Sequence, residues 1–262
     1  MNREILLEVK NISKTVHGLA GSKVRILDKV NFNIEKPEPL GQIISFVAAS
    51  ASELTSLLKI ISAVEKPSDG EVYLSGKHYH KPAGDIVFIP ENPSSFPWLN
   101  VRQNVEFAVR RQEYKTTSIV NNVNETISLV GLEGYETHFP DNNSLGFRFR
   151  ISLARALAAG PKIILLDEPL KNLHGETKKE IFNLITELPK KICVTIIIAL
   201  TNISDAVLLS DKIFLMTRRP GKVADTIDIL RTNDLNIQSD SFHSLKIKIE
   251  KLLSGYENNP SG

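Results

Sequence analysis

Three stretches of the chain are almost continuously apolar. They span residues 43–47, 163–166 and 194–198, and most of their residues are Ile, Leu or Val. Strands that are covered on both faces, as in a parallel sheet, have this uninterrupted apolar character. The pattern predicts that these stretches are the central strands of a parallel sheet.

Other β-rich runs alternate with segments of helical periodicity. Strands are predicted over residues 6–9, 24–34, 71–74, 86–89 and 212–216. A strand-helix-strand order of this kind is typical of an α/β domain with a largely parallel sheet. The sequence therefore predicts an α/β fold.

Helical periodicity replaces the strand pattern between residues 100 and 157, which predicts a helical insert. A strong helix-forming stretch closes this insert and ends at Gly160-Pro161. Farther on, residues 219–221 predict a hairpin turn and residues 240–253 predict a helix. The insert has apolar residues at helical spacing at Val101, Val105, Phe107 and Val109, and then at Ile119, Val120, Val123, Ile127 and Val130.

Composition and charge narrow the function classes. The chain has 262 residues with 32 Lys and Arg against 30 Asp and Glu, so there is no basic field of the kind that binds nucleic acid. The first residues contain charges, so no signal peptide is expected, and the longest apolar stretch, 192–200, is too short to span a membrane. A single cysteine, Cys193, excludes a disulfide framework and is expected to be a small core residue.

One stretch of the chain carries a family resemblance. The segment SLARALAAGPKIILLDEP, at residues 152–169, closely resembles the ATP-binding cassette (ABC) ATPase family. Residues 66–72 resemble the segment that follows the first helix in this family. Residues 96–101 resemble its loop that contacts the membrane subunit. Together with residues 216–223, the Phe-Pro-Trp segment resembles the importer branch for nitrate, sulfonate, taurine and related anions.

This resemblance implies a P-loop NTPase-like ABC cassette, with a mostly parallel sheet core, an antiparallel β portion and a helical subdomain. It implies one ABC-type domain over residues 1–262, with a core at 1–90 and 159–230, a helical subdomain at about 91–158 and a C-terminal helical extension at 231–262. The implied cofactors are ATP and Mg²⁺, and the implied partners are transmembrane permease subunits.

The phosphate-binding loop expected after residues 43–47 is degenerate. By alignment with the family pattern, Ala48, Ala51 and Glu53 replace glycines, and Leu54 replaces the lysine. Glycine permits the positive φ values that turn successive amides toward a phosphate. Only Thr55 and Ser56 remain of the family's nucleotide contacts here, with Thr55 also the expected metal ligand. Autonomous binding of ATP and Mg²⁺ by this chain is therefore doubtful.

The same stretch fits a helix start. The sequence from Ser50 to Glu53 matches the capping box, in which a hydroxyl and a carboxylate satisfy the first amides of the helix. Glu53 would then occupy the place where a phosphate gains from the helix dipole. A serine-rich helix start without this role is the alternative interpretation.

The remaining nucleotide positions of the family are only partly present. Asp167 keeps the metal-organising position and Glu168 the general-base position, although without a phosphate anchor Glu168 is vestigial or conditional. In the signature loop, Ser144 and Gly146 remain while Leu145 replaces a glycine. These two residues could close the ATP site of a second cassette, or they could simply begin a packed helix.

Several further positions depart from the family pattern. No Phe, Tyr or Trp occurs at residues 15–17, where an aromatic side chain would stack on adenine, and the expected glutamine is absent from both Pro90 and Glu91. His174 stands in place of an Asp that communicates across the dimer, and Thr201 in place of the switch histidine. The sensors of a bound nucleotide are therefore largely missing.

These observations favour a pseudo-ATPase: an importer-type cassette subunit that docks on a membrane permease, pairs with an intact cassette and is inactive alone. Such a subunit would be cytoplasmic and peripheral to the cell membrane. Two alternatives stay open, namely an active ATPase with an atypical phosphate loop and a regulatory or scaffold cassette protein outside transport.

Overall fold

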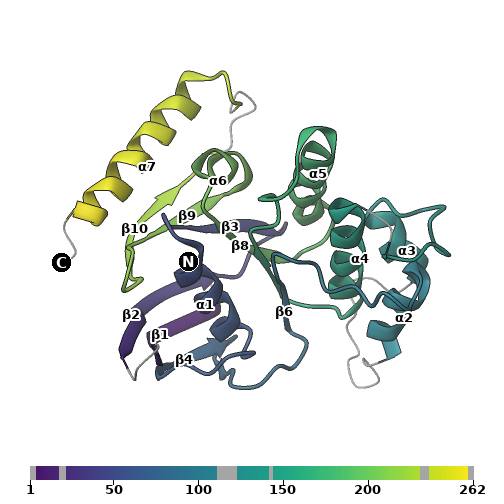
Figure 1. The fold of residues 1–262 in the computed structure, drawn as a ribbon, viewed down its shortest axis with the longest axis horizontal. Coiled ribbons are helices and arrows are strands. Elements are labelled where there is room, and N and C mark those ends of the chain that lie inside the picture. Colours follow the sequence, from purple (N-terminus) through teal and green to yellow (C-terminus); the bar gives the residue numbers. More distant parts are fainter. Residues whose placement is uncertain (1–3, 18–21, 111–122, 142–143, 231–235, 259–262) are drawn as a thin grey trace. The chain divides into compact units, whose positions relative to one another are not determined.

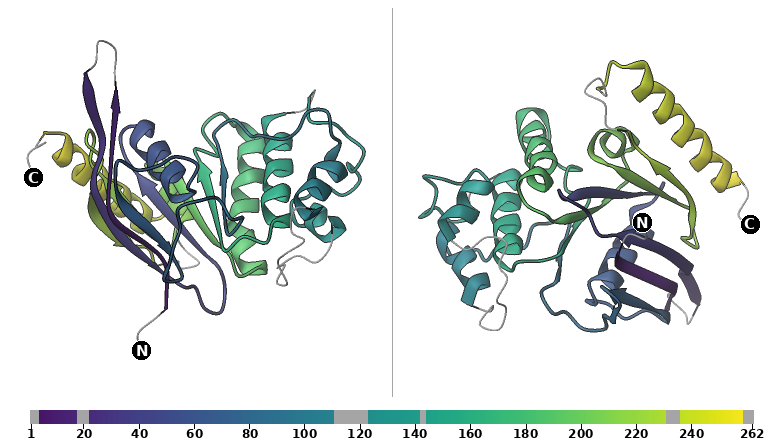
Figure 2. Two further views of the ribbon diagram at one scale, coloured as in Figure 1. Left: turned by 90° about the horizontal axis from the view of Figure 1, so that it is seen from below. Right: turned by 180° about the vertical axis from the view of Figure 1, so that it is seen from behind.

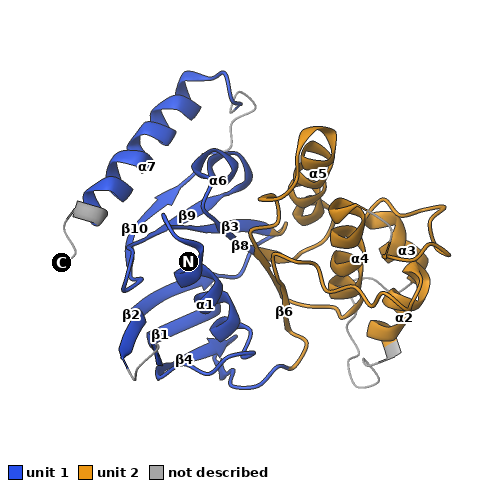
Figure 3. Cartoon of the chain, in the orientation of Figure 1, with its two compact units in different colours: residues 1–38, 42–82, 197–262 blue, residues 39–41, 83–196 orange. Residues whose placement is uncertain are grey.

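The protein is described by a computed structural model that covers residues 4–17, 22–110, 123–141, 144–230 and 236–258 (Figure 1). The chain forms two compact units (Figure 3). Unit 1 comprises residues 1–38, 42–82 and 197–262, and unit 2 comprises residues 39–41 and 83–196.

Unit 1 contains an antiparallel sheet with the strand order β2-β1-β4-β5. Strands β1 and β2 pair as a long ribbon (Figure 2). Their apolar residues, among them Leu7, Val9, Leu27 and Val30, are buried. This sheet is the predicted antiparallel portion, although the short β5 was not predicted from the sequence. The strands are β1 (Ile5–His17), β2 (Lys23–Glu35), β4 (Asp69–Leu74) and β5 (Lys77–His78).

The parallel part of unit 1 follows the strand order β10-β9-β3-β8. Strand β3 is parallel to β9, and β10 is antiparallel to β9, so the turn predicted at residues 219–221 does form a hairpin. The edge strand β10 was not predicted from the sequence. These strands are β3 (Gln42–Val47), β8 (Thr195–Leu200), which crosses the boundary between the units, β9 (Lys212–Met216) and β10 (Val223–Asp228).

Three aromatic rings join the two sheets of unit 1. Phe46 of β3 lies 4.9 Å from both Phe32 of β2 and Phe214 of β9, measured between ring centroids. Such offset and tilted ring pairs stabilise a core beyond the area that they bury. Helix α1 packs on β2, and α7 packs on α6. The helices of this unit are α1 (Ala51–Ile61), α6 (Ile203–Leu209) and α7 (Asp240–Asn258).

Unit 2 combines a parallel strand pair with a group of helices. Ile86 to Ile89 of β6 pair in register with Ile163 to Leu166 of β7. Helices α2, α3 and α4 pack against one another, which agrees with the predicted helical insert; Ile119 and Val120 of that prediction lie outside the described residues. The elements are β6 (Ile86–Ile89), α2 (Val101–Arg110), α3 (Val123–Leu129), α4 (Leu145–Ala158), β7 (Ile163–Asp167) and α5 (Gly175–Lys191).

Burial along the chain supports most of the apolar pattern and corrects one expectation. Every residue of β7 and β8 is buried, as expected of strands covered on both faces. Cys193 is exposed, so the expectation of a core residue was wrong. The reason is that β8 begins only at Thr195, which leaves Cys193 in the segment before the strand. No helix in the described ranges has the length and apolarity needed to cross a membrane.

Candidate functional site

The segment between β3 and α1 occupies the position of the phosphate loop. Helix α1 begins at Ala51, and its N-cap residue, Ser50, has an extended backbone with φ −132° and ψ 136°. No residue from Ala48 to Leu54 has a positive φ. Successive amides therefore do not form the concave nest that binds a phosphate. The loop is an ordinary capped helix start.

Glu53 fills the N-terminal end of α1. Its side chain is fully buried, with 0% exposure. The Ser52 hydroxyl donates a hydrogen bond to Glu53 Oε2 at 2.8 Å, and the other carboxylate oxygen, Oε1, lies 3.6 Å from Nε of Arg219. A negative charge is stabilised at a helix N-terminus, where the first backbone N–H groups have no intrahelical partner. The carboxylate thus stands where an anionic ligand would gain most.

The cap differs in detail from the predicted capping box. Ser50 is the N-cap as expected, but its hydroxyl accepts from the backbone N–H of Ser52, at 3.4 Å, and also lies 3.0 Å from the Ser52 hydroxyl. In a capping box, the Glu53 carboxylate would accept from the backbone N–H of the N-cap residue. Here the carboxylate is drawn toward the Ser52 hydroxyl and the Arg219 cation.

The environment of Glu53 favours its charged form. Burial raises the pKa of this carboxyl, whereas the Ser50 and Ser52 hydroxyls and the backbone N–H groups of Glu53 and Arg219 lower it. The lowering contributions together exceed the effect of burial, so the pKa of Glu53 lies below its ordinary value. Glu53 is therefore a permanent anion at neutral pH.

The residues at this end of α1 do not fit a nucleotide phosphate with its metal. Leu54, in the lysine position, is an apolar side chain with 0% exposure. Thr55 and Ser56 are half-buried on the same helix. A phosphate approaching this end would meet the Glu53 carboxylate, and the first turn of α1 has no cation to offer it. The expected ATP and Mg²⁺ contacts of Thr55 and Ser56 stay a prediction that the surroundings disfavour.

In unit 2, strand β7 presents the two retained carboxylates. Asp167 is the last residue of β7 and Glu168 follows it; both are buried, at 5% and 3% exposure. Glu168 has a φ of +47°, a left-handed conformation that is strained for a residue with a side chain. The strand therefore places both groups at its carboxyl end, the usual position for such residues in parallel sheets.

Glu91, one of the two positions where the family's glutamine was expected, belongs to an ionic cluster. Glu91 Oε1 accepts a hydrogen bond from Asn172 Nδ2 at 3.0 Å and lies 3.2 Å from Lys171 Nζ. Both partners belong to the loop that follows Glu168. Sequence reasoning noted the missing glutamine but not this pairing, because the residues are about eighty positions apart. The opposite charges of Glu91 and Lys171 were the available signal.

The signature-loop residues lie at the start of α4. Ser144 is the N-cap, and its hydroxyl accepts from the Phe147 backbone N–H at 3.2 Å. Gly146 is required by packing, because a Cβ at this position would lie 2.5 Å from Cγ2 of Thr177 on α5. Residue 143 of the same motif lies outside the described residues. Helix α4, like α1, is capped by the chain itself.

Replacing Ser144 with alanine is expected to lower the free energy of unfolding by about 1 kcal/mol, because the cap of α4 is lost. Urea denaturation followed by circular dichroism measures the change. Ser144→Asp keeps a capping oxygen and should retain most of the stability. An equal loss in both variants would contradict the capping role.

An aromatic loop, residues 96–99, is fixed by two residues that the sequence analysis did not single out. Asn104, fully buried, accepts from the Phe96 backbone N–H and donates to the carbonyls of Phe96 and Leu99. The Arg155 guanidinium lies 4.0 Å from the centroid of the Phe96 ring and donates to the Ser94 carbonyl. Trp98 is left 70% exposed. The loop thus presents a large aromatic surface on a rigid base.

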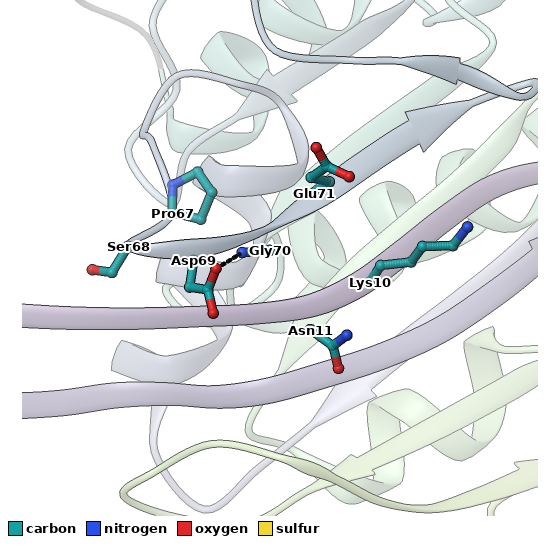
Figure 4. A pocket seen from close by; sticks show the side chains of 7 residues that line it. All are labelled: Lys10, Asn11, Pro67, Ser68, Asp69, Gly70 and Glu71. Atoms are coloured by element: carbon teal, nitrogen blue, oxygen red, sulfur yellow. Dashed lines mark hydrogen bonds between the residues drawn. The ribbon is translucent and has the colours of Figure 1, made fainter.

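Unit 1 also has a hollow with a polar lining. A hollow of about 510 Å³ is lined by Lys10, Asn11 and residues 67–71, and there Asp69 Oδ1 accepts from the adjacent Gly70 N–H (Figure 4). Gly70 has a φ of +90° and packs on the Asn11 carbonyl, which explains the glycine. Within the described ranges, no group of three or more His, Cys, Asp or Glu residues is placed to hold a metal ion.

Comparison with known proteins identifies the class. The ABC transporter family model matches residues 27–171, and the chain belongs to this family. It is 31% identical to the taurine import ATP-binding protein TauB of Jannaschia sp., over 83% of this chain and 80% of TauB. It is 27% identical to the nitrate import ATP-binding protein NrtD of Synechocystis sp., over 92% of this chain and 88% of NrtD.

Solved structures confirm the fold. The dimeric ATP-binding cassette MJ0796 bound to ADP and Pi superposes with a TM-score of 0.72 at 25% identity, covering 87% of this chain and all of that chain. The predicted ABC cassette fold and the resemblance to the nitrate, sulfonate and taurine branch are therefore confirmed. The division into core, helical subdomain and C-terminal extension stays a prediction, as do the roles of Glu168, Asp167, Ser144 and Gly146.

Proposed function

We propose that this chain is the cassette subunit of an importer-type ABC transporter and that it does not bind ATP on its own. The observation that carries the proposal is the fully buried, negatively charged Glu53 at the N-terminus of α1, beside an apolar Leu54. The protein occupies its own phosphate position with a carboxylate. The fold is that of an ATPase, but its anchor for the nucleotide is gone.

The binding free energy lost with the lysine supports a site that does not hold ATP. A lysine about 4 Å from a phosphate charge contributes on the order of 4 kcal/mol at an effective dielectric constant near 20. Removing that amount from a micromolar affinity, near −8 kcal/mol, leaves millimolar binding. The Glu53 charge adds repulsion. Nucleotide would then be weakly held at cellular concentrations.

The aromatic loop suits docking on a permease. Trp98 is 70% exposed and Phe107 is 40% exposed, and Phe96 contacts both rings at 5.4 and 4.8 Å between centroids. Aromatic residues are enriched in the energetic centres of protein interfaces. This surface is proposed to seat the cytoplasmic segment of the transmembrane subunit, which would place the chain at the cytoplasmic face of the membrane.

The partner subunit proposed for this chain is an intact cassette. A homodimer would carry two altered phosphate loops, whereas a heteromer keeps one functional loop on the partner. Ser144 and Gly146, at the start of α4, would close that composite site. One site of the pair would then work while the other is silent.

Isothermal titration of the purified chain with Mg-ATP tests the proposal. No saturable binding is expected below about 1 mM, because both the lysine and the glycines are missing. Micromolar affinity would overturn it. An unchanged ATP turnover of the assembled complex after the double substitution Glu53→Gly and Leu54→Lys would favour the active-ATPase alternative.

Purification from native membranes tests the partners. Recovery of a permease together with an intact cassette is the expected result. Recovery of a soluble partner alone would favour the scaffold alternative. The variant Trp98→Ala tests the docking surface and should reduce recovery of the permease if the aromatic loop seats it.

A further inference from the structure

The turn between β9 and β10 lies directly against the N-terminus of α1. A Cβ added to Gly221 would be 3.0 Å from Cβ of Glu53 and 3.1 Å from Cδ2 of Leu27. The close approach explains the glycine at this position of the turn. It also brings the preceding Arg219 to the helix end where Glu53 is buried.

This turn is rigidly mounted on β2. The Gly221 N–H donates to the Ile26 carbonyl at 2.7 Å, and the Asp28 N–H donates to the Gly221 carbonyl at 3.1 Å. Lys222 Nζ lies 3.3 Å from Asp28 Oδ2. Within the turn, the Thr217 hydroxyl donates to the Pro220 carbonyl at 2.7 Å. These contacts therefore hold the backbone of the turn that carries Arg219 in place.

The Glu53 carboxylate is only partly satisfied. Oε2 has the Ser52 hydroxyl at 2.8 Å, but Oε1 is buried without a hydrogen-bond partner and has Arg219 Nε at 3.6 Å, beyond hydrogen-bond distance. A buried charge of this kind is costly unless other charges and dipoles compensate for it. The α1 N-terminus and the Arg219 cation supply that compensation from two sides.

We propose that Glu53 is an internal ligand and that Arg219 takes the place of the missing lysine, so that the turn and α1 together form a latent anion site blocked by the protein's own carboxylate. The proposal rests on the proposed function and deepens it. The ligand class is a polyphosphate anion, which would reach this site only when Glu53 is removed. Arg219, 60% exposed, is then the cation that meets it.

Titration with inorganic pyrophosphate, followed by calorimetry at low salt, tests the proposal. The wild-type chain should show no binding. The variant Glu53→Gly should gain saturable binding, and adding Arg219→Ala to it should weaken that binding about tenfold, the value of one charge-assisted hydrogen bond. Arg218→Ala in the Glu53→Gly background is the matched control, because Arg218 is the exposed neighbour of Arg219, and it should leave the affinity within about twofold.

Two results would overturn the proposal. Either Glu53→Gly binds no pyrophosphate while remaining folded by circular dichroism, or the Arg219 and Arg218 substitutions weaken binding equally. Both results differ from the one that would refute the proposed function, namely binding of ATP by the wild-type chain. If Glu53→Gly does not fold, a double-mutant cycle with Glu53→Gln and Arg219→Gln replaces it. The cycle should give a coupling of about fivefold in the unfolding constant, and no coupling would overturn the proposal.

Discussion

Replacing Glu53 with glutamine is expected to lower the free energy of unfolding by about 2 kcal/mol. The carboxylate accepts from the Ser52 hydroxyl, faces Arg219 and sits at the positive end of α1. Hydrogen bonds to a charged group contribute about 1.5 to 3 kcal/mol each, and a neutral amide keeps only part of this. The amide also turns an NH₂ group toward other donors. Chemical denaturation at pH 7 measures the loss.

The control for this substitution is Glu176→Gln. Glu176 also lies in the first turn of a helix, α5, but its side chain is 76% exposed. Removing an exposed charge changes stability by less than about 0.5 kcal/mol. Equal losses in the two variants would mean that the burial of Glu53 has no energetic consequence.

The stability difference between wild type and Glu53→Gln is expected to depend on pH. The pKa of Glu53 is lower in the folded protein than its ordinary value of 4.5. The stability contributed by the charged form is therefore fully present above pH 4.5 and is lost as the pH falls through the lower folded pKa. The difference between wild type and Glu53→Gln should shrink toward acid pH. A difference that grows on acidification would contradict this account.

Replacing Asn104 with leucine is expected to lower the free energy of unfolding by about 3 kcal/mol and to loosen the aromatic loop. The Asn104 side chain accepts from Phe96 N–H and donates to three carbonyls, at 2.8 to 3.1 Å. Leucine fills a similar volume but makes none of these hydrogen bonds. Each contributes about 1 kcal/mol, and less at the carbonyls of Phe96 and Asn100, which also accept from backbone N–H groups. The loop would then lose its rigid base.

Trp98 is the single tryptophan of the chain, so its fluorescence reports on this loop alone. Its anisotropy should fall in Asn104→Leu, because the indole gains rotational freedom. Asn33→Leu, at an exposed position of β2, is the control and should change neither the anisotropy nor the stability appreciably. A rigid Trp98 in the Asn104 variant would show that other contacts hold the loop.

The apolar pattern was sufficient to predict most of the fold. The strands predicted at residues 43–47, 163–166 and 194–198 are nearly continuous apolar runs, and each overlaps an observed strand. The short β5 and the polar edge strand β10 were missed, because two residues or a mixed pattern carry little periodic signal. Cys193 was misplaced because an apolar neighbourhood does not locate the first residue of a strand.

The candidate site was predicted in part. The altered residues at 48–54 and the N-cap at Ser50 follow from local sequence, and the structure places the cap where expected. The contacts of Arg219 with Glu53, and of Lys171 with Glu91, join positions far apart in the chain. Local propensity contains no information on such pairs, so they emerged only from the folded arrangement.

The cluster of Glu91, Lys171 and Asn172 joins two segments about eighty positions apart, so a substitution in one segment changes the contacts of the other. Glutamine at position 91 would leave Lys171 without the carboxylate that now lies 3.2 Å away. A small residue at position 171 would leave Glu91 with only the Asn172 amide. The residue at position 91 therefore limits which residues position 171 accepts without the loss of a contact.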